Sequence, residues 1–338
     1  MDEIKVGVIG FGYWGPNLAR NFFDLPSAKL VAIADSKEER LERAQSFYPQ
    51  AVMVKDYQEL FDLGLDAVVV STPPVTHHPI AMDCLLHGLH VLVEKPMTLN
   101  SQHAEELIEL ADKKGLTLMV GHTFEYNSAV VALKKYVDNG ELGKIYYLDT
   151  ARLNLGLFQR NSNVLWDLAP HDISILLHLI GELPISVSGQ GMHCVSDGIY
   201  DVAYLNLVFP NQLPAFVHVS WLDPCKVRRV TIVGSKKMAV YNDVETEQKI
   251  RIYDKGVEAP AYTNGFGEFQ YNYRSGDITI PKVRITEPLK EECQHFVDCI
   301  VNHTEPRSSG RNGLRVVKIL EAAQKSIMNG STHEVIQW

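Results

Sequence analysis

The sequence predicts an α/β protein of two domains, an N-terminal doubly wound parallel sheet and a C-terminal α+β domain with an antiparallel sheet. Three observations support this fold class. A glycine-rich turn at 10–15 lies between an apolar run and a helical pattern. The run 66–71 has an uninterrupted apolar centre, which is typical of a parallel strand buried on both faces. Residues 216–221 alternate in period two, which indicates an antiparallel sheet with one buried face.

The 338 residues allow about two domains, which we place at 1–122 and 123–338, with the last helices free to pack back on the first domain. In the first domain we expect strands at 4–9, 30–34, 66–71, 90–94 and 116–122, and helices at 17–23, 36–47, 79–87 and 101–114, the last capped by Ser101. In the second we expect helices at 129–139, within 163–179, at 289–301 and at 313–328, and strands at 144–155, 185–195, 201–209, 215–222 and 227–233. Residues 235–288 are expected to form short strands and a long excursion.

The glycine-rich turn has the spacing G-x-G-x-x-G. Gly10 permits the tight turn, Gly12 lets a pyrophosphate approach the backbone, and Gly15 lets the helix pack close to the strand. The helix N-terminus then offers N–H groups to phosphate oxygens. Asp35 ends the next strand, where a carboxylate accepts hydrogen bonds from ribose hydroxyls and repels a 2′-phosphate, so NAD is expected over NADP even though Lys37 is near. The expected cofactor-binding residues here are Gly10, Phe11, Gly12, Tyr13, Trp14, Gly15 and Asp35.

Two further patterns carry chemistry. Lys95 follows a strand end, where ligands of open α/β sheets bind, and can donate to a substrate hydroxyl; the alternative is an ordinary surface lysine. Asp167 and His171 are four residues apart, which places them on one face of a helix. An imidazole beside a carboxylate can take the proton of an alcohol, and the alternative is a helix cap with a packing histidine.

Composition excludes several classes of function. The net charge of −9 and the lack of a basic run argue against nucleic-acid binding, and no apolar stretch is long enough for a membrane span. The five cysteines form no disulfide framework and the N-terminus resembles no secretory signal, so we expect a cytoplasmic protein. The thirteen histidines lack metal-ligand spacing apart from the adjacent His77 and His78, which cannot both point the same way on a strand, and no metal is expected.

Taken together, the motifs resemble those of the Gfo/Idh/MocA oxidoreductases along essentially the whole chain. The matching segments are the glycine turn, Thr72-Pro73 with His77 and Ala81, Glu94-Lys95-Pro96, and Asp167 with His171. The resemblance implies that Lys95 and His171 transfer protons and that Asp167 positions the substrate. It adds Ser71, Thr72, Pro73, His77, Glu94 and Lys95 to the cofactor-binding residues. It also implies a large open C-terminal sheet and a homo-oligomer, either a dimer or a tetramer.

The segments 152–156 and 163–172 resemble a subgroup that oxidises nucleotide-linked amino sugars, notably UDP-N-acetylglucosamine at C3, before a PLP-dependent transaminase acts in lipid A or polysaccharide biosynthesis. The expected substrate-binding residues are Tyr126, Asn127, Arg152, Asn154, Asp167 and His171. Cations for a diphosphate are available at Arg152, Arg160, Arg228 and Arg229, and aromatic surfaces for uracil at Tyr126, Phe158 and Trp166. For each arginine taken singly, a solvated strand or loop charge is the favoured alternative. Three alternatives stay open: a dehydrogenase or ketoreductase of another sugar or an inositol, an NAD-dependent redox glycosidase, and a non-enzymatic NAD sensor.

Overall fold

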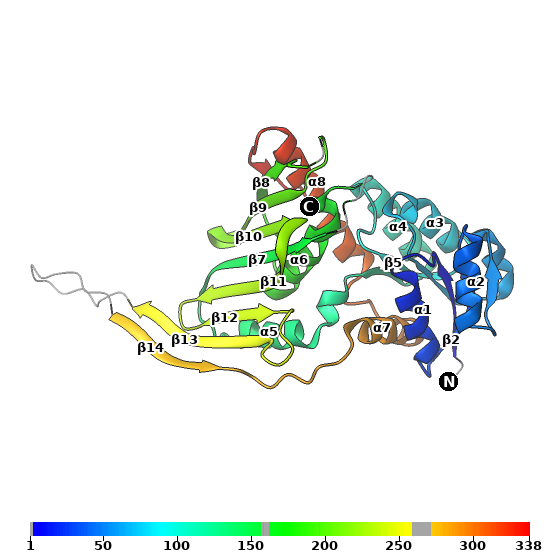
Figure 1. Ribbon diagram of the computed structural model, residues 1–338, viewed down its shortest axis with the longest axis horizontal. Coiled ribbons are helices and arrows are strands. Elements are labelled where there is room, and N and C mark those ends of the chain that lie inside the picture. Colours follow the sequence, from blue (N-terminus) through cyan, green and yellow to red (C-terminus); the bar gives the residue numbers. More distant parts are fainter. Residues whose placement is uncertain (1–2, 157, 159–161, 196, 259–271) are drawn as a thin grey trace, which may run out of the picture. The chain divides into compact units, whose positions relative to one another are not determined.

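A computed structural model describes residues 3–156, 158, 162–195, 197–258 and 272–338, which divide into two compact units (Figure 1). Unit 1 comprises Met1–Tyr126 and Thr286–Glu321, and unit 2 comprises Asn127–Ile285 and Ala322–Trp338. Residues 286–321 therefore group with unit 1 although they follow residue 122 in the sequence, and the sequence interpretation had left the last helices free to pack back on the first domain. The reason is that Leu289 and Phe296 are buried in the same hydrophobic core as Phe22.

Unit 1 is built on a six-stranded parallel sheet, which confirms the predicted doubly wound fold. Its strand order is β3-β2-β1-β4-β5-β6. The strands are β1 (Ile4–Ile9), β2 (Ala28–Ala34), β3 (Val52–Val54), β4 (Ala67–Val70), β5 (His90–Glu94) and β6 (Leu118–Gly121). The α-helices are α1 (Gly15–Asp24), α2 (Glu38–Phe47), α3 (His77–Leu86), α4 (Ser101–Lys114) and α7 (Pro288–Asn302), and short 3₁₀ helices are η1 (Tyr57–Leu63), η2 (Pro74–Thr76) and η3 (Thr123–Tyr126).

The apolar pattern of the strands explains the layering of unit 1. All four residues of β4 are buried, because helices cover both faces of the sheet. Helix α7 joins the face that carries α1, where Phe296 meets the ring of Phe22 edge-on at 6.3 Å between centroids.

Two local features of unit 1 differ from the sequence interpretation. Helix α4 is capped by Asn100, whose side chain accepts from the His103 backbone N–H, so the expected cap at Ser101 is wrong. Strand β3 and η1 were not predicted, since β3 is only three residues long. Asp56 and Glu59 form a capping box at the start of η1, which is the local signal for it.

Unit 2 is built on a nine-stranded sheet in the order β14-β13-β12-β11-β7-β10-β9-β8-β15. Every pair is antiparallel except β7 and β10, which run parallel, so the predicted antiparallel sheet is in fact mixed. The strands are β7 (Ile145–Leu155), β8 (Ser186–Met192), β9 (Val202–Phe209), β10 (Leu213–Ser220), β11 (Leu222–Gly234), β12 (Met238–Asn242), β13 (Ile250–Glu258), β14 (Asn272–Thr279) and β15 (Glu334–Val335). The helices are α5 (Ser128–Asp138), α6 (Val164–Ile180) and the 3₁₀ turn η4 (Pro210–Gln212); α8 (Gly310–Met328) begins in unit 1 and ends in unit 2.

The two faces of the unit 2 sheet differ. Helix α6 packs on β7, β9 and β10, and the side chains on that face, such as Leu205 and Val217, are buried. The alternate side chains face away from α6, and among them Tyr204 and Phe216 are 46% and 40% exposed. Among the helices that the structure describes, none combines the length and apolar character needed to cross a membrane.

Candidate active site

The turn between β1 and α1 is closed so tightly that glycine is required at two positions. Gly10 has φ +94°, and a Cβ there would lie 2.8 Å from the Ser71 carbonyl oxygen. A Cβ on Gly15 would overlap the carbonyl oxygen of Gly10. The Ser71 hydroxyl donates to that same oxygen at 2.8 Å, so the end of β4 holds the turn in place.

Asp35 supports this turn from the end of β2. Its carboxylate accepts from the backbone N–H groups of Phe11 at 2.7 Å and Lys37 at 2.9 Å, and Arg40 Nη1 lies 3.2 Å away. The guanidinium of Arg40 also lies beside Gly12. Sequence reasoning missed Arg40, which lies in the first turn of α2. Its guanidinium brings a positive charge beside Asp35, at the ribose end of the predicted site.

The turn fits a dinucleotide. Trp14 precedes α1 and gives no side-chain hydrogen bond to the helix. Among the described residues, the N-terminus of α1 therefore has no side-chain cap, and its backbone N–H groups can face a phosphate. Tyr13 is 86% exposed and stacks on Trp14, whereas Phe11 is buried in the core. Phe11 can therefore contribute its backbone but not its ring.

His77 connects the ends of β4 and β5. Its Nδ1 lies 2.9 Å from the Pro96 carbonyl oxygen, and its Nε2 lies 2.8 Å from that of Thr72. Burial lowers the pKa of the imidazole, although the hydrogen bonds to the two carbonyl groups oppose this. His77 is thus buried behind the strand ends, where it orients the backbone on both sides of Lys95.

Lys95 follows β5 directly and lies among buried titratable groups. Burial raises the pKa of Glu94 to about 7, although the Lys95 charge opposes this. Burial and the same charge lower the pKa of His122, at the end of β6, to about 3. Within the described residues, neither ring nitrogen of His122 has a hydrogen-bond partner. Sequence reasoning missed His122, since only its position after a strand distinguished it.

Two further buried acids belong to this cluster. Burial raises the pKa of Glu125 to about 8, against the opposing charges of Arg307 and Arg315. Glu292, from α7, accepts from the Thr123 hydroxyl at 2.8 Å, and burial with the nearby Glu94 charge raises its pKa well above the usual range. Glu125 and Glu292 therefore carry protons near neutral pH, and they add no full negative charge to the interior of unit 1.

In unit 2, α6 presents Asp167 and His171 on adjacent turns. Asn163 caps the helix, because its side chain accepts from the Trp166 backbone N–H at 3.2 Å. Asp167 instead accepts from the indole N–H of Trp221 at 3.0 Å. The side chains of Asp167 and His171 are both half-buried. The capping alternative considered for Asp167 is therefore wrong, and the indole fixes the direction of its carboxylate.

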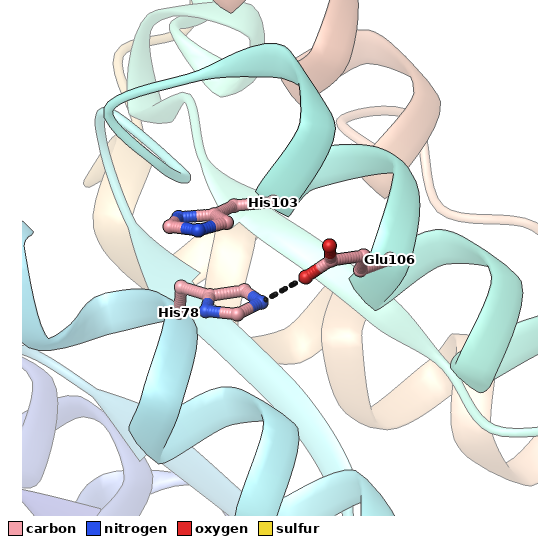
Figure 2. A group of neighbouring side chains, drawn as sticks. All are labelled: His78, His103 and Glu106. Carbon is pink, nitrogen blue, oxygen red and sulfur yellow. Dashed lines mark ion pairs between the residues drawn. The ribbon is translucent and has the colours of Figure 1, made fainter.

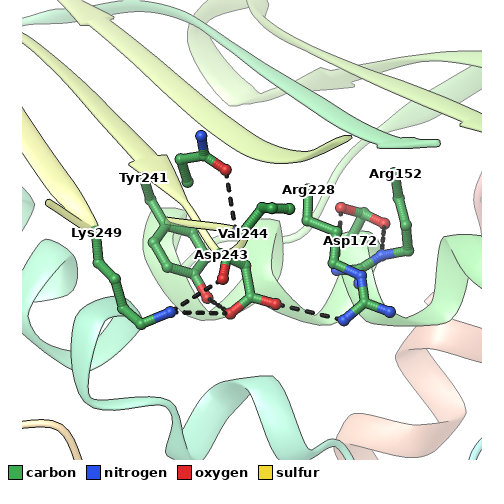
Figure 3. Close-up of polar contacts among 8 residues, drawn as sticks. Arg152, Asp172, Arg228, Tyr241, Asp243, Val244 and Lys249 are labelled. Carbon is green, nitrogen blue, oxygen red and sulfur yellow. Dashed lines mark hydrogen bonds and ion pairs between the residues drawn. The ribbon is translucent and has the colours of Figure 1, made fainter. Parts of the chain in front are cut away.

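A buried ion pair attaches α6 to the sheet (Figure 3). Arg152 on β7 donates through Nε to Asp172 at 2.6 Å, and both side chains are at most 4% exposed. Beside it, Arg228 pairs with Asp243, which also accepts from the Tyr241 hydroxyl. Two of the arginines expected to bind a diphosphate, Arg152 and Arg228, are thus paired with aspartates of unit 2. Arg152 positions the helix that carries Asp167 and His171.

Two of the remaining expected substrate residues, Tyr126 and Asn127, have local structural partners. Tyr126 is buried in unit 1, and its hydroxyl lies 3.1 Å from that of Ser308. Asn127 caps α5 by accepting from the Ala129 backbone N–H. Asn154 lies near the end of β7 and is half-buried. Arg160 lies outside the described residues.

Comparison with known proteins agrees with this architecture. A family model described as "Oxidoreductase family, NAD-binding Rossmann fold" matches residues 4–122, and the GFO/IDH/MocA C-terminal domain matches residues 130–240. UDP-N-acetylglucosamine 3-dehydrogenase from Acidithiobacillus ferrooxidans is 26% identical over 94% of this chain and 95% of its own length. The NAD(+)-dependent scyllo-inositol 2-dehydrogenase of Bacillus subtilis is 26% identical over 97% and 95%.

Solved structures show the same fold. A structure of the Acidithiobacillus ferrooxidans enzyme superposes with a TM-score of 0.81 at 25% identity, covering 97% of this chain and 99% of that one. The structure of GenD2 from gentamicin A biosynthesis in complex with NAD has a TM-score of 0.84 at 21% identity, covering 100% and 97%. The first part of unit 1 is therefore an NAD-binding domain.

The buried acids predict how stability depends on pH. Glu125 keeps its proton in the folded state up to about pH 8, whereas the unfolded chain releases it near 4.5, so stability falls as pH rises between these values. Glu125→Gln holds the side chain neutral and removes this contribution. We expect the melting temperature of the variant to fall less than that of the wild type from about pH 5 to about pH 8.5, by about 5 °C.

Differential scanning calorimetry across this pH range measures the effect. The exposed Glu42→Gln variant is the matched control and should follow the wild type. Parallel curves for Glu125→Gln and the wild type would contradict a protonated Glu125.

Proposed function

This chain belongs to the Gfo/Idh/MocA oxidoreductase family, and on that premise we propose that it uses NAD to oxidise C3 of UDP-N-acetylglucosamine to the 3-keto sugar. A relative with this activity in its name aligns along nearly the whole chain. The ketone would be consumed by a PLP-dependent transaminase, which places the reaction in the cytoplasmic nucleotide-sugar pool. The substrate hydroxyl loses a proton, and its carbon loses a hydride.

Each chemical task is assigned to residues of this chain. Bound NAD supplies the hydride acceptor. Lys95 donates to the substrate oxygen, and His171 receives the hydroxyl proton. Asp167 orients the sugar and stabilises the charged imidazole. Burial keeps His122 neutral, so it adds no second positive charge beside Lys95. Burial also raises the pKa of Glu94 to about 7, so this acid carries only part of a negative charge at neutral pH.

One observation carries the proposal. Asn163 caps α6, and the Trp221 indole holds Asp167 in a half-buried position one turn before His171. A carboxylate that only capped the helix would need neither the indole nor this spacing. A half-buried carboxylate beside an imidazole is the pair that alcohol oxidation needs.

Inositol oxidation is the second candidate. Myo-inositol 2-dehydrogenase from Thermotoga maritima and the NAD(+)-dependent scyllo-inositol enzyme are 26% identical to this chain, as is the nucleotide-sugar enzyme. The engagement of Arg152 and Arg228 by aspartates favours it, because a free polyol needs no cation for a diphosphate.

Substrate oxidation can be followed through NADH absorbance. We expect NADH to form from NAD and UDP-N-acetylglucosamine, and the yield to increase when a 3-aminotransferase, PLP and glutamate remove the unfavourable ketone. The analogue that lacks the 3-hydroxyl should form none. NADH formation with inositols but not with UDP-sugars, on protein shown to bind NAD, would contradict the nucleotide-sugar assignment and support the alternative. Release of free sugar without net NADH would indicate the redox glycosidase.

The catalytic assignment is tested by two substitutions. Lys95→Ala and His171→Ala are each expected to lower kcat by about a hundredfold or more, because each removes a proton-transfer group. NAD binding, measured by fluorescence quenching, should persist. Lys113→Ala and His333→Ala, at exposed positions, are the matched controls. Rates near those of the wild type in both alanine variants would refute the assignment.

We also propose that the exposed face of the unit 2 sheet forms a homo-oligomer. Tyr204 and Phe216 are apolar groups on that face, beside the exposed ion pair of Arg229 with Asp149. Light scattering coupled to gel filtration should give a dimer or tetramer. Phe216→Asp should lower the mass, because it buries a charge in the interface, whereas the exposed Phe47→Asp in unit 1 should not. A monomeric wild-type protein would contradict this interface.

A further inference from the structure

Three metal-ligating side chains meet on the surface of unit 1, between α3 and α4 (Figure 2). His78 comes from the first turn of α3, and His103 and Glu106 come from α4. One ligand atom of each residue lies within 4.8 Å of the ligand atoms of the other two. None of the three has a part in the proposed oxidation.

We propose that His78, His103 and Glu106 form a binding site for a divalent transition-metal ion, with zinc the ion that suits the ligands best. Two imidazoles and one carboxylate are a ligand set of zinc sites that keep one position open to water. Sequence spacing predicted no metal because the ligands come from two helices. His103 and Glu106 are three residues apart, so they share one face of α4.

The distances are close to those that coordinate a metal. His78 Nε2 lies 2.9 Å from Glu106 Oε2, and the two imidazole rings stack at 3.9 Å between centroids with 9° between their planes. Zinc bonds of about 2.0–2.2 Å place tetrahedral ligands about 3.3–3.6 Å apart. Because the ligand atoms lie within 4.8 Å of one another, the widest separation must close by no more than about 1.5 Å, and one stacked ring must tilt so that both lone pairs converge.

Neighbouring side chains hold the ligands. Gln102 donates to Glu106 Oε1 at 3.1 Å, which leaves Oε2 directed at His78. The Asn100 amide lies 3.1 Å from His103 Nδ1 while its oxygen caps the helix. A metal on His103 must displace either this amide or the proton of the other ring nitrogen. Gln102 is therefore a supporting partner of the kind that orients ligands in metal sites, whereas the Asn100 amide must release His103 before that ring binds a metal.

Access from solvent also fits a cation. The His78 and Glu106 side chains are 20% and 39% exposed, which leaves a path from solvent. His77, the preceding residue, points instead at the Thr72 and Pro96 carbonyl groups. The metal would thus anchor α3 one residue after the histidine that orients the strand ends.

Isothermal titration of the tag-free, chelator-treated, full-length protein with ZnCl₂ tests the site. The exposed thiols of Cys194 and Cys225 are first replaced by serine, because thiolates bind zinc. We expect one zinc per chain and a melting temperature that rises by several degrees at saturation. His103→Ala and Glu106→Gln should each weaken binding by at least about tenfold.

His87→Ala is the matched control, because His87 lies exposed at the other end of α3. Glu106→Gln is isosteric, so it keeps the test valid if His103→Ala fails to fold. A Co²⁺ titration should give a visible absorption band in the wild type that both ligand variants lose. No zinc binding by the wild type, or equal binding by the wild type and Glu106→Gln, would overturn the proposal.

Discussion

The need to neutralise buried charge organises the interiors of both units. In unit 2 the side chains of Arg152 and Asp172 are both buried and form an ion pair. Burying either charge alone would destabilise the fold, since breaking such a pair costs about 3–5 kcal/mol. In unit 1 the same constraint is met by protonation, because burial raises the pKa of Glu94 and Glu125 toward or above neutrality. One unit therefore holds α6 by an ion pair, and the other buries acids whose pKa values are raised.

The sequence predicted the parallel sheet of unit 1 well, because its signals are local. The glycine turn requires φ +94° at Gly10, and the apolar centre of β4 requires burial on both faces. The parallel pairing of β7 with β10 was missed, since strand direction depends on contacts between segments that lie far apart in the sequence. Residue Glu292 was missed for the same reason, because only the packing of α7 against unit 1 brings it near Thr123.

The site residues divide in the same way. The spacing of Asp167 and His171 is a local property of a helix, and it was recognised. Arg152 was interpreted as a free cation because its partner, Asp172, lies on another element. A sequence does not show which residue a charged side chain pairs with, so the burial of Arg152 could be learned only from the fold. Relatives named for a nucleotide sugar and for inositols align equally well, and the substrate must therefore be argued from such contacts rather than from the fold.

Asparagine caps explain how one helix can serve both stability and chemistry. Asn100, Asn127 and Asn163 begin α4, α5 and α6, and each accepts a backbone N–H through its side chain. Because a neutral amide satisfies the helix end, the charged residue in the first turn of α6 is released for another contact. Asp167 uses that freedom to face the Trp221 indole. The helix dipole favours a negative charge at this end of α6, so the position suits a carboxylate that is not needed as the cap.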